Sequence, residues 1–207
     1  AVGLHLEIVE FDLGVVSNET EESFRSMKRE ISRLAEITEG YLSLARSPRM
    51  NFEKTNLNEI IYQLKELYRP VLADGNIEWH CDLQQIPDFE MDQKNIVLVI
   101  GNLIKNAIDA MSSDNVNTPT IRILTRFNPL REQAEIEFHD NGPGIDAKAQ
   151  ASIFSPFFTT KATGTGLGLS HSKQIIDAHG GEIAFQSFEN KGTSFYINLP
   201  VNRGMNA

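Results

Sequence analysis

"FSPFFTTKATGTGLGLSHS", residues Phe154 to Ser172, runs from paired phenylalanines through alternating glycines into an apolar stretch with helical spacing. Glycine lets a ligand approach the backbone closely, and successive N–H groups at the start of a helix bind anions. Lys161 places an ammonium group just upstream of Gly164, Gly166 and Gly168. The stretch predicts a phosphate-binding loop, although it matches neither the dinucleotide-binding nor the Walker pattern, and a glycine run alone is a weak signal.

The bulk composition is that of a folded, water-soluble chain. Of its 207 residues, 41% are hydrophobic and 23% are charged, which suits one domain and a smaller element. A net charge of -9 argues against a nucleic-acid partner. The single cysteine, Cys81, excludes an internal disulfide and favours a cytoplasmic location. No apolar run is long enough to span a bilayer, so we expect no membrane contact by this chain, while the anchoring of a longer parent stays open.

The N-terminal part predicts a helical hairpin over residues 1–46. Apolar residues recur at steps of three and four from Val2 to Val16 and again from Phe24 to Leu44, and Pro48 ends the second helix. A hairpin alone leaves its apolar stripes uncovered, so we expect a homodimeric four-helix bundle; docking on the rest of the same chain is the alternative. Residues 47–56 read as a linker.

Residues 57–201 mix helix and strand patterns without regular alternation. Helical patterns cover 57–72, 93–113 and 168–179, and strand patterns cover 76–83, 120–127, 134–140, 181–188 and 193–200. We therefore expect an α+β chain in which the hairpin precedes an α/β sandwich, with one mixed sheet and helices on one face. Residues 202–207 form a tail.

The helix predicted over 93–113 carries an unusual polar face. Asn102, Asn106 and Asp109 follow one another at steps of four and three, with Lys105 beside them. Solvated helix faces prefer Lys and Glu to Asn. Amide and carboxylate oxygens suit Mg²⁺, which keeps several waters and needs few protein ligands. A buried amide network is the alternative.

Asp140 ends a predicted strand and is followed by Gly142 and Gly144. The apolar residues on one side of this strand make partial burial of the carboxylate expected, and a buried carboxylate needs donors. The exocyclic amino group of adenine would be such a donor. A simple strand-ending turn explains the same residues equally well.

Four motifs together resemble the N, G1, F and G2 boxes of sensor histidine kinases: "NLIKNAIDA", "DNGPGI", "FSPFFTTK" and "GTGLGLS", in this order. "GTSFYINLP" resembles the last strand of the same ATP-binding domain, and the hairpin resembles the dimerisation and phosphotransfer domain. The resemblance implies an ATP-dependent protein histidine kinase of a two-component system. Such an enzyme transfers the γ-phosphoryl group to a histidine on the hairpin, and then to an aspartate of a response regulator.

The resemblance also implies roles for individual residues. Asn106 would hold Mg²⁺, and Asp140 would accept a hydrogen bond from the adenine amino group, with Thr193 supporting it through water. The segment from about Asp146 to Thr163 would be a mobile lid. The implied catalytic set is Asn102, Lys105 and Lys161. The implied nucleotide pocket comprises Asn102, Asn106, Asp109, Asp140, Gly142, Gly144, Ile145, Lys161, Gly164, Thr165, Gly166, Leu167, Gly168, Leu169 and Thr193.

One family feature is missing. The acceptor sequence, His–acid–x–x–Asn/Thr–Pro, does not occur, and His5 is followed by Leu6 and Glu7 without a proline. We expect that the chain was cut just after this motif and that this fragment cannot phosphorylate itself; a naturally acceptor-less pseudokinase or scaffold is the alternative. An ATPase of the gyrase or chaperone type is a further alternative, but it would need a glutamate base where this chain has Asn102.

Overall fold

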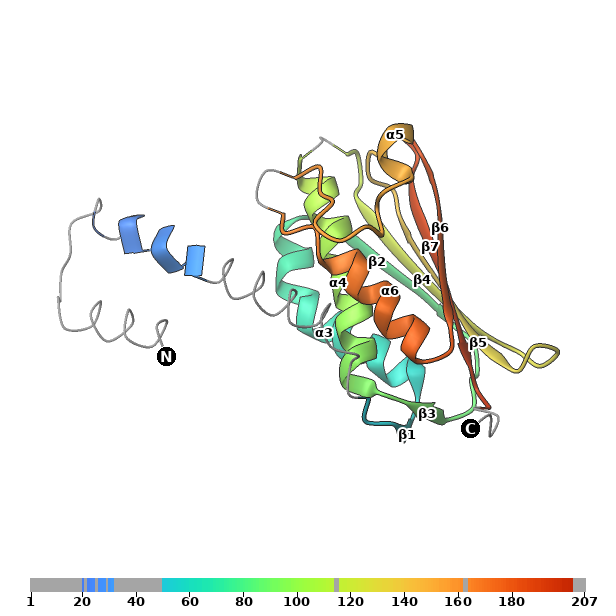
Figure 1. Ribbon diagram of the computed structural model, residues 1–207. Helices are drawn as coiled ribbons and strands as arrows, with labels where there is room; N and C mark the ends of the chain where they lie inside the picture. Colours follow the sequence, from blue (N-terminus) through green and yellow to red (C-terminus); the bar gives the residue numbers. More distant parts are fainter. Residues whose placement is uncertain are drawn as a thin grey trace. The chain divides into compact units, whose positions relative to one another are not determined.

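The computed structural model describes residues 20, 22–24, 26–28, 30–31, 50–113, 116–161 and 164–202 (Figure 1). The chain divides into two compact units, Ala1–Ser47 and Pro48–Ala207. In the first unit, the described residues between 20 and 31 are helical, and Phe24 is buried. The predicted hairpin turn, most of the apolar stripes and His5 lie outside the described residues.

The second unit is built on a five-stranded sheet in the order β2-β4-β5-β7-β6. The strands are β2 (Glu78–Leu83), β4 (Thr120–Asn128), β5 (Gln133–Asp140), β6 (Glu182–Phe188) and β7 (Gly192–Pro200). β2 and β4 are parallel, and the other neighbours are antiparallel. The mixed sheet predicted from the sequence is therefore confirmed.

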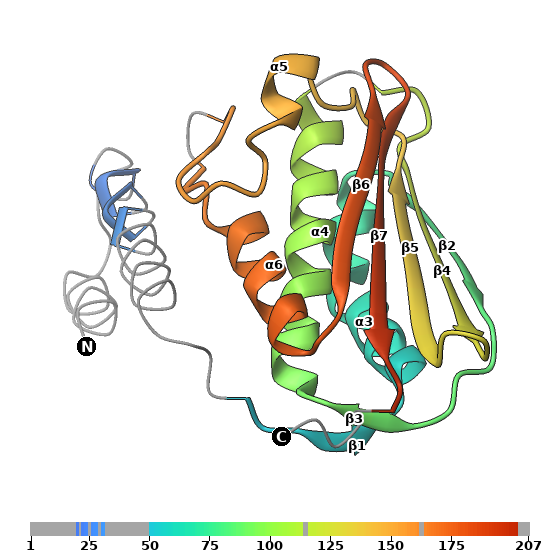
Figure 2. The same cartoon turned by 45° about the vertical axis from the view of Figure 1, so that its right-hand side comes forward.

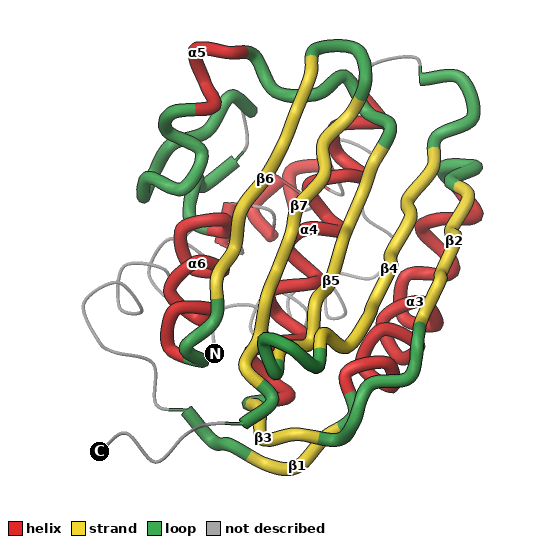
Figure 3. The backbone as a smooth tube through the Cα atoms, turned by 90° about the vertical axis from the view of Figure 1, so that its right-hand side faces the viewer, coloured by secondary structure: helices red, strands yellow, loops and turns green. Residues whose placement is uncertain are grey.

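The three long helices are α3 (Leu57–Asp74), α4 (Gln93–Ser113) and α6 (Gly168–Ala178), and all lie on one face of the sheet (Figures 2 and 3). Alternation within the strands turns Ile121, Ile123, Ile136 and Phe138 toward these helices, where each is almost fully buried. A short helix, α5 (Ala147–Gln150), follows the end of β5. In the part of the chain that the structure describes, no helix combines the length and apolar character needed to cross a membrane.

A second, two-stranded sheet was not predicted. It pairs β1 (Glu53–Thr55), inside the segment expected to be a linker, with β3 (Phe89–Met91) in antiparallel register. The backbone N–H of Asn51 donates to Asp92 Oδ2 at 2.7 Å, and the ring of Phe52 meets that of His179 edge to face. We call residues Asn51–Thr55 the entry strap.

Asp92 is the residue on which the entry strap, α4 and α6 converge. Its Oδ1 accepts from the backbone N–H of Asn95 at 3.0 Å, which caps the start of α4. Its own backbone N–H donates to His179 Nε2 at 3.0 Å, directly after the last residue of α6. His179 Nδ1 donates to the carbonyl of Ile175 at 2.7 Å, because a neutral imidazole that accepts at one nitrogen donates at the other.

Candidate functional site

One face of α4 brings the predicted site residues into line. Asn102 contacts the first residue of α6, and Asn106 and Asp109, about one turn further on, contact Lys161. Beyond them, a Cβ atom added at Gly142 would lie 3.6 Å from the Cβ atom of Ala110, so the turn after β5 lies against the same helix. The loop of residues 164–169, which we call the glycine loop, is thus arranged along a single helix together with Lys161 and the turn after β5. This helix is their common support.

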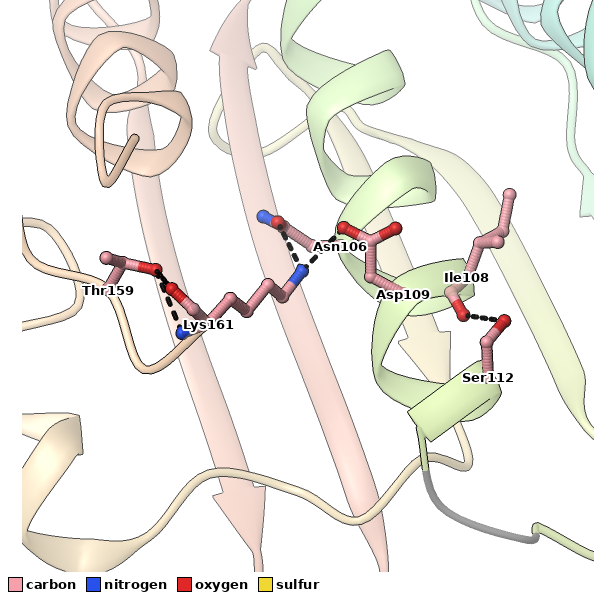
Figure 4. Close-up of polar contacts among 6 residues, drawn as sticks. All are labelled: Asn106, Ile108, Asp109, Ser112, Thr159 and Lys161. Atoms are coloured by element: carbon pink, nitrogen blue, oxygen red, sulfur yellow. Dashed lines mark hydrogen bonds and ion pairs between the residues drawn. The ribbon is translucent and has the colours of Figure 1, made fainter. Parts of the chain in front are cut away.

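Lys161 lies between two oxygen atoms of α4 (Figure 4). Its Nζ is 3.3 Å from Asn106 Oδ1 and 2.8 Å from Asp109 Oδ2. The Lys161 and Asp109 side chains are 35% and 43% exposed, so the ion pair contributes little to stability. These oxygens attract a cation, which is the property expected of a magnesium ligand set. Lys105, on the same helix, is exposed to solvent.

Asn102 faces the start of α6 rather than Lys161. Its Nδ2 donates to the Gly168 carbonyl and to Ser172 Oγ, both at 3.2 Å, and Ser172 Oγ donates to the same carbonyl at 2.8 Å. This amide therefore fixes the end of the glycine loop against α4. A carboxylate could not make these donations, because it can only accept.

The glycine loop needs its glycines for packing as well as for any ligand. Gly166 has a φ of +68°, and a Cβ there would lie 2.4 Å from the Phe157 carbonyl carbon. A Cβ at Gly164 would lie 2.4 Å from Thr159 Oγ1. Thr165 and Leu169 are half-buried, and Leu167 is buried. Among the described side chains, none caps the N-terminus of α6, which is the arrangement that anion-binding helix starts share.

Asp140, the last residue of β5, is buried with 6% exposure. Its Oδ1 accepts from the Gly142 backbone N–H at 3.0 Å. Burial raises the pKa of Asp140, opposed by hydrogen bonds from the Gly142 and Thr193 backbone N–H groups and by the nearby His139. The expected burial of this carboxylate is observed.

The turn after Asp140 is fixed by β6 and β7. Gly144 has a φ of +75°, and a Cβ there would lie 2.2 Å from the Phe188 carbonyl oxygen. The Ile145 backbone N–H donates to Ser187 Oγ at 2.8 Å. Ser187 Oγ also donates to the Gly192 carbonyl at 3.1 Å and lies 2.9 Å from Thr193 Oγ1. Ser187 therefore joins the predicted residues Ile145 and Thr193.

The sequence and fold of this chain are similar to those of known proteins. The family model described as "Histidine kinase-, DNA gyrase B-, and HSP90-like ATPase" matches residues 91–203. The solved catalytic domain of histidine kinase ThkA is 34% identical, with a TM-score of 0.65, over 73% of this chain and 97% of that domain.

The chain belongs to the histidine kinases. Its sequence is 33% identical to the signal transduction histidine-protein kinase AtoS of Escherichia coli (strain K12), over 84% of this chain and 28% of AtoS. It is 32% identical to sporulation kinase E of Bacillus subtilis (strain 168), over 87% of this chain and 24% of that protein. The chain thus spans about a quarter of the length of these curated relatives.

Within this histidine kinase domain, sequence reasoning missed several polar residues that hold the site together. Ser187 and Ser172 link predicted residues, and Gln150 Nε2 donates to the Ile145 carbonyl at 2.9 Å and to the Ser187 carbonyl at 3.2 Å. The glutamine follows Asp146, which caps α5 by accepting from the Lys148 N–H. Polar residues inside strands and short helices were the available signal, but their partners lie far away in sequence.

Proposed function

We propose that this domain binds ATP with Mg²⁺ and forms the catalytic part of an ATP-dependent protein histidine kinase of a two-component system. The observation that carries the proposal is the buried Asp140 carboxylate, which retains acceptor capacity beside the helix that carries Asn106. A buried acceptor of this kind suits the exocyclic amino group of adenine. The family match, whose description names ATPases, supports the same assignment.

The residues present suit a magnesium-bound phosphate chain. Asn106 would hold the ion, and Asp109, whose carboxylate already attracts the Lys161 ammonium, would lie beside it. The ion supplies charge neutralisation when bound. Lys161 would then move from Asp109 to the terminal phosphate, and the loop from Gly164 to Leu169 would direct its N–H groups at the same oxygens.

In the whole protein, the γ-phosphoryl group would pass to a histidine of the helical hairpin, whose acceptor motif does not occur in residues 1–46, and then to a response-regulator aspartate. A structure of ThkA in complex with the response regulator TrrA, which is 29% identical over 94% of this chain, supports this partner class. We further propose a homodimer through the hairpin, a cytoplasmic location, and an ATP domain over 57–201 that residues 47–56 join to the hairpin, with the entry strap already held by the domain.

Two other functions would use the same fold. A gyrase- or chaperone-type ATPase needs a base at position 102, and the Asn102 amide instead donates to Gly168 and Ser172. A scaffold that binds nucleotide without transferring phosphate would need Asp140 for adenine binding but would not need Lys161 at the terminal phosphate. The contact of Lys161 with Asn106 and Asp109 therefore favours transfer over simple binding.

Calorimetric titration with ADP and ATP, with and without Mg²⁺, tests nucleotide binding. We expect binding that strengthens with Mg²⁺, and we expect Asn106→Ala to remove the magnesium dependence while leaving magnesium-free ADP binding in place. Asn58→Ala is the matched control, because this half-buried helix amide bonds Gln84 and Thr125 instead. Absence of ADP and ATP binding by the unmodified chain would refute the proposal.

Labelling of the full-length protein from γ-labelled ATP tests transfer. We expect an acid-labile, base-stable label, as a phosphoramidate on histidine requires. Nucleotide binding without any label would favour the scaffold, and steady release of inorganic phosphate without label would favour the ATPase.

A further inference from the structure

We propose that Ser187 is a positioning residue that fixes the Thr193 hydroxyl as a hydrogen-bond acceptor toward the base-binding end of the site. The wall formed by Asp140 and Thr193 then offers acceptors only, and it selects a purine with an amino group at position 6 over one with a carbonyl there. This inference rests on the proposed nucleotide binding and deepens it.

The Ser187 hydroxyl has three hydrogen-bonding neighbours but only one hydrogen. A serine hydroxyl has one hydrogen and two lone pairs. The Ile145 N–H can only donate, so it takes one lone pair at 2.8 Å. The Gly192 carbonyl can only accept, so it takes the single hydrogen at 3.1 Å. The remaining contact, 2.9 Å to Thr193 Oγ1, has a donor that geometry alone does not fix, and only donation by Thr193 makes all three contacts hydrogen bonds at once.

Thr193 stands beside Asp140 across the sheet. The two residues are paired in the β5–β7 register, and the Thr193 backbone N–H is one of the donors that act on the Asp140 carboxylate. Ser187, Thr193 and Asp140 are all buried, so water competes poorly for their hydrogen bonds. With its hydrogen directed to Ser187, the Thr193 hydroxyl presents only lone pairs elsewhere.

The consequence is a specificity rule. Adenine carries an amino group at position 6, which has two hydrogens to donate. Hypoxanthine and guanine carry a carbonyl oxygen there, which faces the Asp140 and Thr193 oxygens without a hydrogen between them. A site built to hydrogen-bond one group rejects an analogue that cannot do so, because its buried polar atoms are left unpaired.

Ser187→Ala is the direct test, with ADP and inosine diphosphate as the probes. Removing the Ser187 oxygen frees the Thr193 hydroxyl to rotate and donate to a carbonyl. We expect the ratio of the two Kd values, measured by calorimetry, to fall about tenfold, the size of one misplaced hydrogen bond. Ser187→Thr, which keeps the hydroxyl, is expected to retain the unmodified ratio.

A double-mutant cycle separates this role from a general loss of structure. Thr193→Val removes the oriented hydroxyl, so adding Ser187→Ala to it is expected to change the ratio no further. Thr125→Val is the matched control, because it removes a buried hydroxyl of the same sheet that bonds Asn58, and it should lower stability without altering the ratio.

The outcomes distinguish the two proposals. If the unmodified chain binds neither nucleotide, both proposals fail. If it binds ADP but Ser187→Ala leaves the ratio unchanged, or lowers it equally in the Thr193→Val background, only the Ser187 inference fails. Should Ser187→Ala not fold, Thr193→Val alone decides, since an unchanged ratio in that variant overturns the inference.

Discussion

Asp92 and Asp140 are two carboxylates buried to nearly the same degree at opposite ends of the domain, with 4% and 6% exposure. Asp92 accepts from the Asn51 N–H at 2.7 Å, the Asn95 N–H at 3.0 Å and the Asn95 side chain at 2.9 Å. Asp140 accepts only from backbone N–H groups of Gly142 and Thr193 among the described residues.

The pKa shifts of the two acids go in opposite directions. Burial raises the pKa of each, but at Asp92 the hydrogen bonds from Asn51 and Asn95 outweigh burial, and its pKa is lowered. At Asp140 burial dominates and the pKa is raised. A carboxylate that its own chain has satisfied holds structure together, whereas one with remaining acceptor capacity is ready for a ligand.

The largest expected effect is on nucleotide affinity. Asp140→Asn should weaken ADP binding about 100-fold, because an amide nitrogen then competes for the acceptor position that the adenine amino group needs. Asp92→Asn should leave the Kd within about threefold, because this residue lies at the other end of α4. Calorimetry measures both. Equal losses in the two variants would break the distinction between a structural and a ligand-binding acid.

The same two substitutions are expected to change the free energy of unfolding in opposite directions. Asp92→Asn is expected to lower the free energy of unfolding by about 2 kcal/mol at neutral pH, since hydrogen bonds to a buried charge are lost. Asp140→Asn is expected to raise it, because a buried charge with few donors is removed. Urea denaturation followed by circular dichroism measures each value, and a destabilised Asp140→Asn protein would contradict the account.

Acidification provides a sharper test of the same pair. The lowered pKa of Asp92 gives stability that is present above its unfolded-state pKa and is lost as pH falls through the folded pKa. The raised pKa of Asp140 gives stability that is present at low pH and is lost as pH rises through the folded pKa. Asp140→Asn should therefore approach the unmodified protein once pH falls below the ordinary aspartate pKa, and Asp92→Asn only once pH falls through the lowered pKa of Asp92, with the two variants starting from opposite sides. Urea midpoints at several pH values measure this convergence.

The smallest effect is expected at a third carboxylate, Asp109, which is half-exposed beside Lys161. Asp109→Asn should change the free energy of unfolding by less than about 0.5 kcal/mol, because water screens the pair. Asp177→Asn, in the exposed pair with Lys173, is the matched control and should change it as little. Thermal melts check both, and a loss above about 1 kcal/mol at Asp109 would mean that this pair supports the fold.

Much of the catalytic domain could be predicted from sequence because its signals are local. The pattern over 93–113 gives α4 with its observed bounds. Residue chemistry suggested an adenine donor for Asp140 and an anion site beside Lys161, and the family resemblance implied their individual roles. The structure brings Lys161 to Asn106 and Asp109, while the roles themselves stay predictions.

The features that could not be predicted depend on contacts between distant segments. β1 and β3 have three residues each, too few for a period of two to be visible, and they pair across more than thirty positions. Ser187 reads as an ordinary polar residue on a strand until β6, β7 and the turn after β5 are folded together. Asn51, the distant donor to Asp92, bonds through its backbone N–H, which every non-proline residue has, so its side chain gave no signal of this contact.

The entry strap limits the reach of whatever precedes this domain. Asn51 is already bonded to Asp92, and residues 53–55 are already paired with β3. Of the ten residues expected to form a tether, at most the four from 47 to 50 remain outside these contacts. Four extended residues span no more than about 14 Å, against about 35 Å for ten. If the proposed phosphoryl transfer takes place, a tether of four residues would limit how far this domain can swing relative to residue 46, whereas ten free residues would allow more than twice that distance.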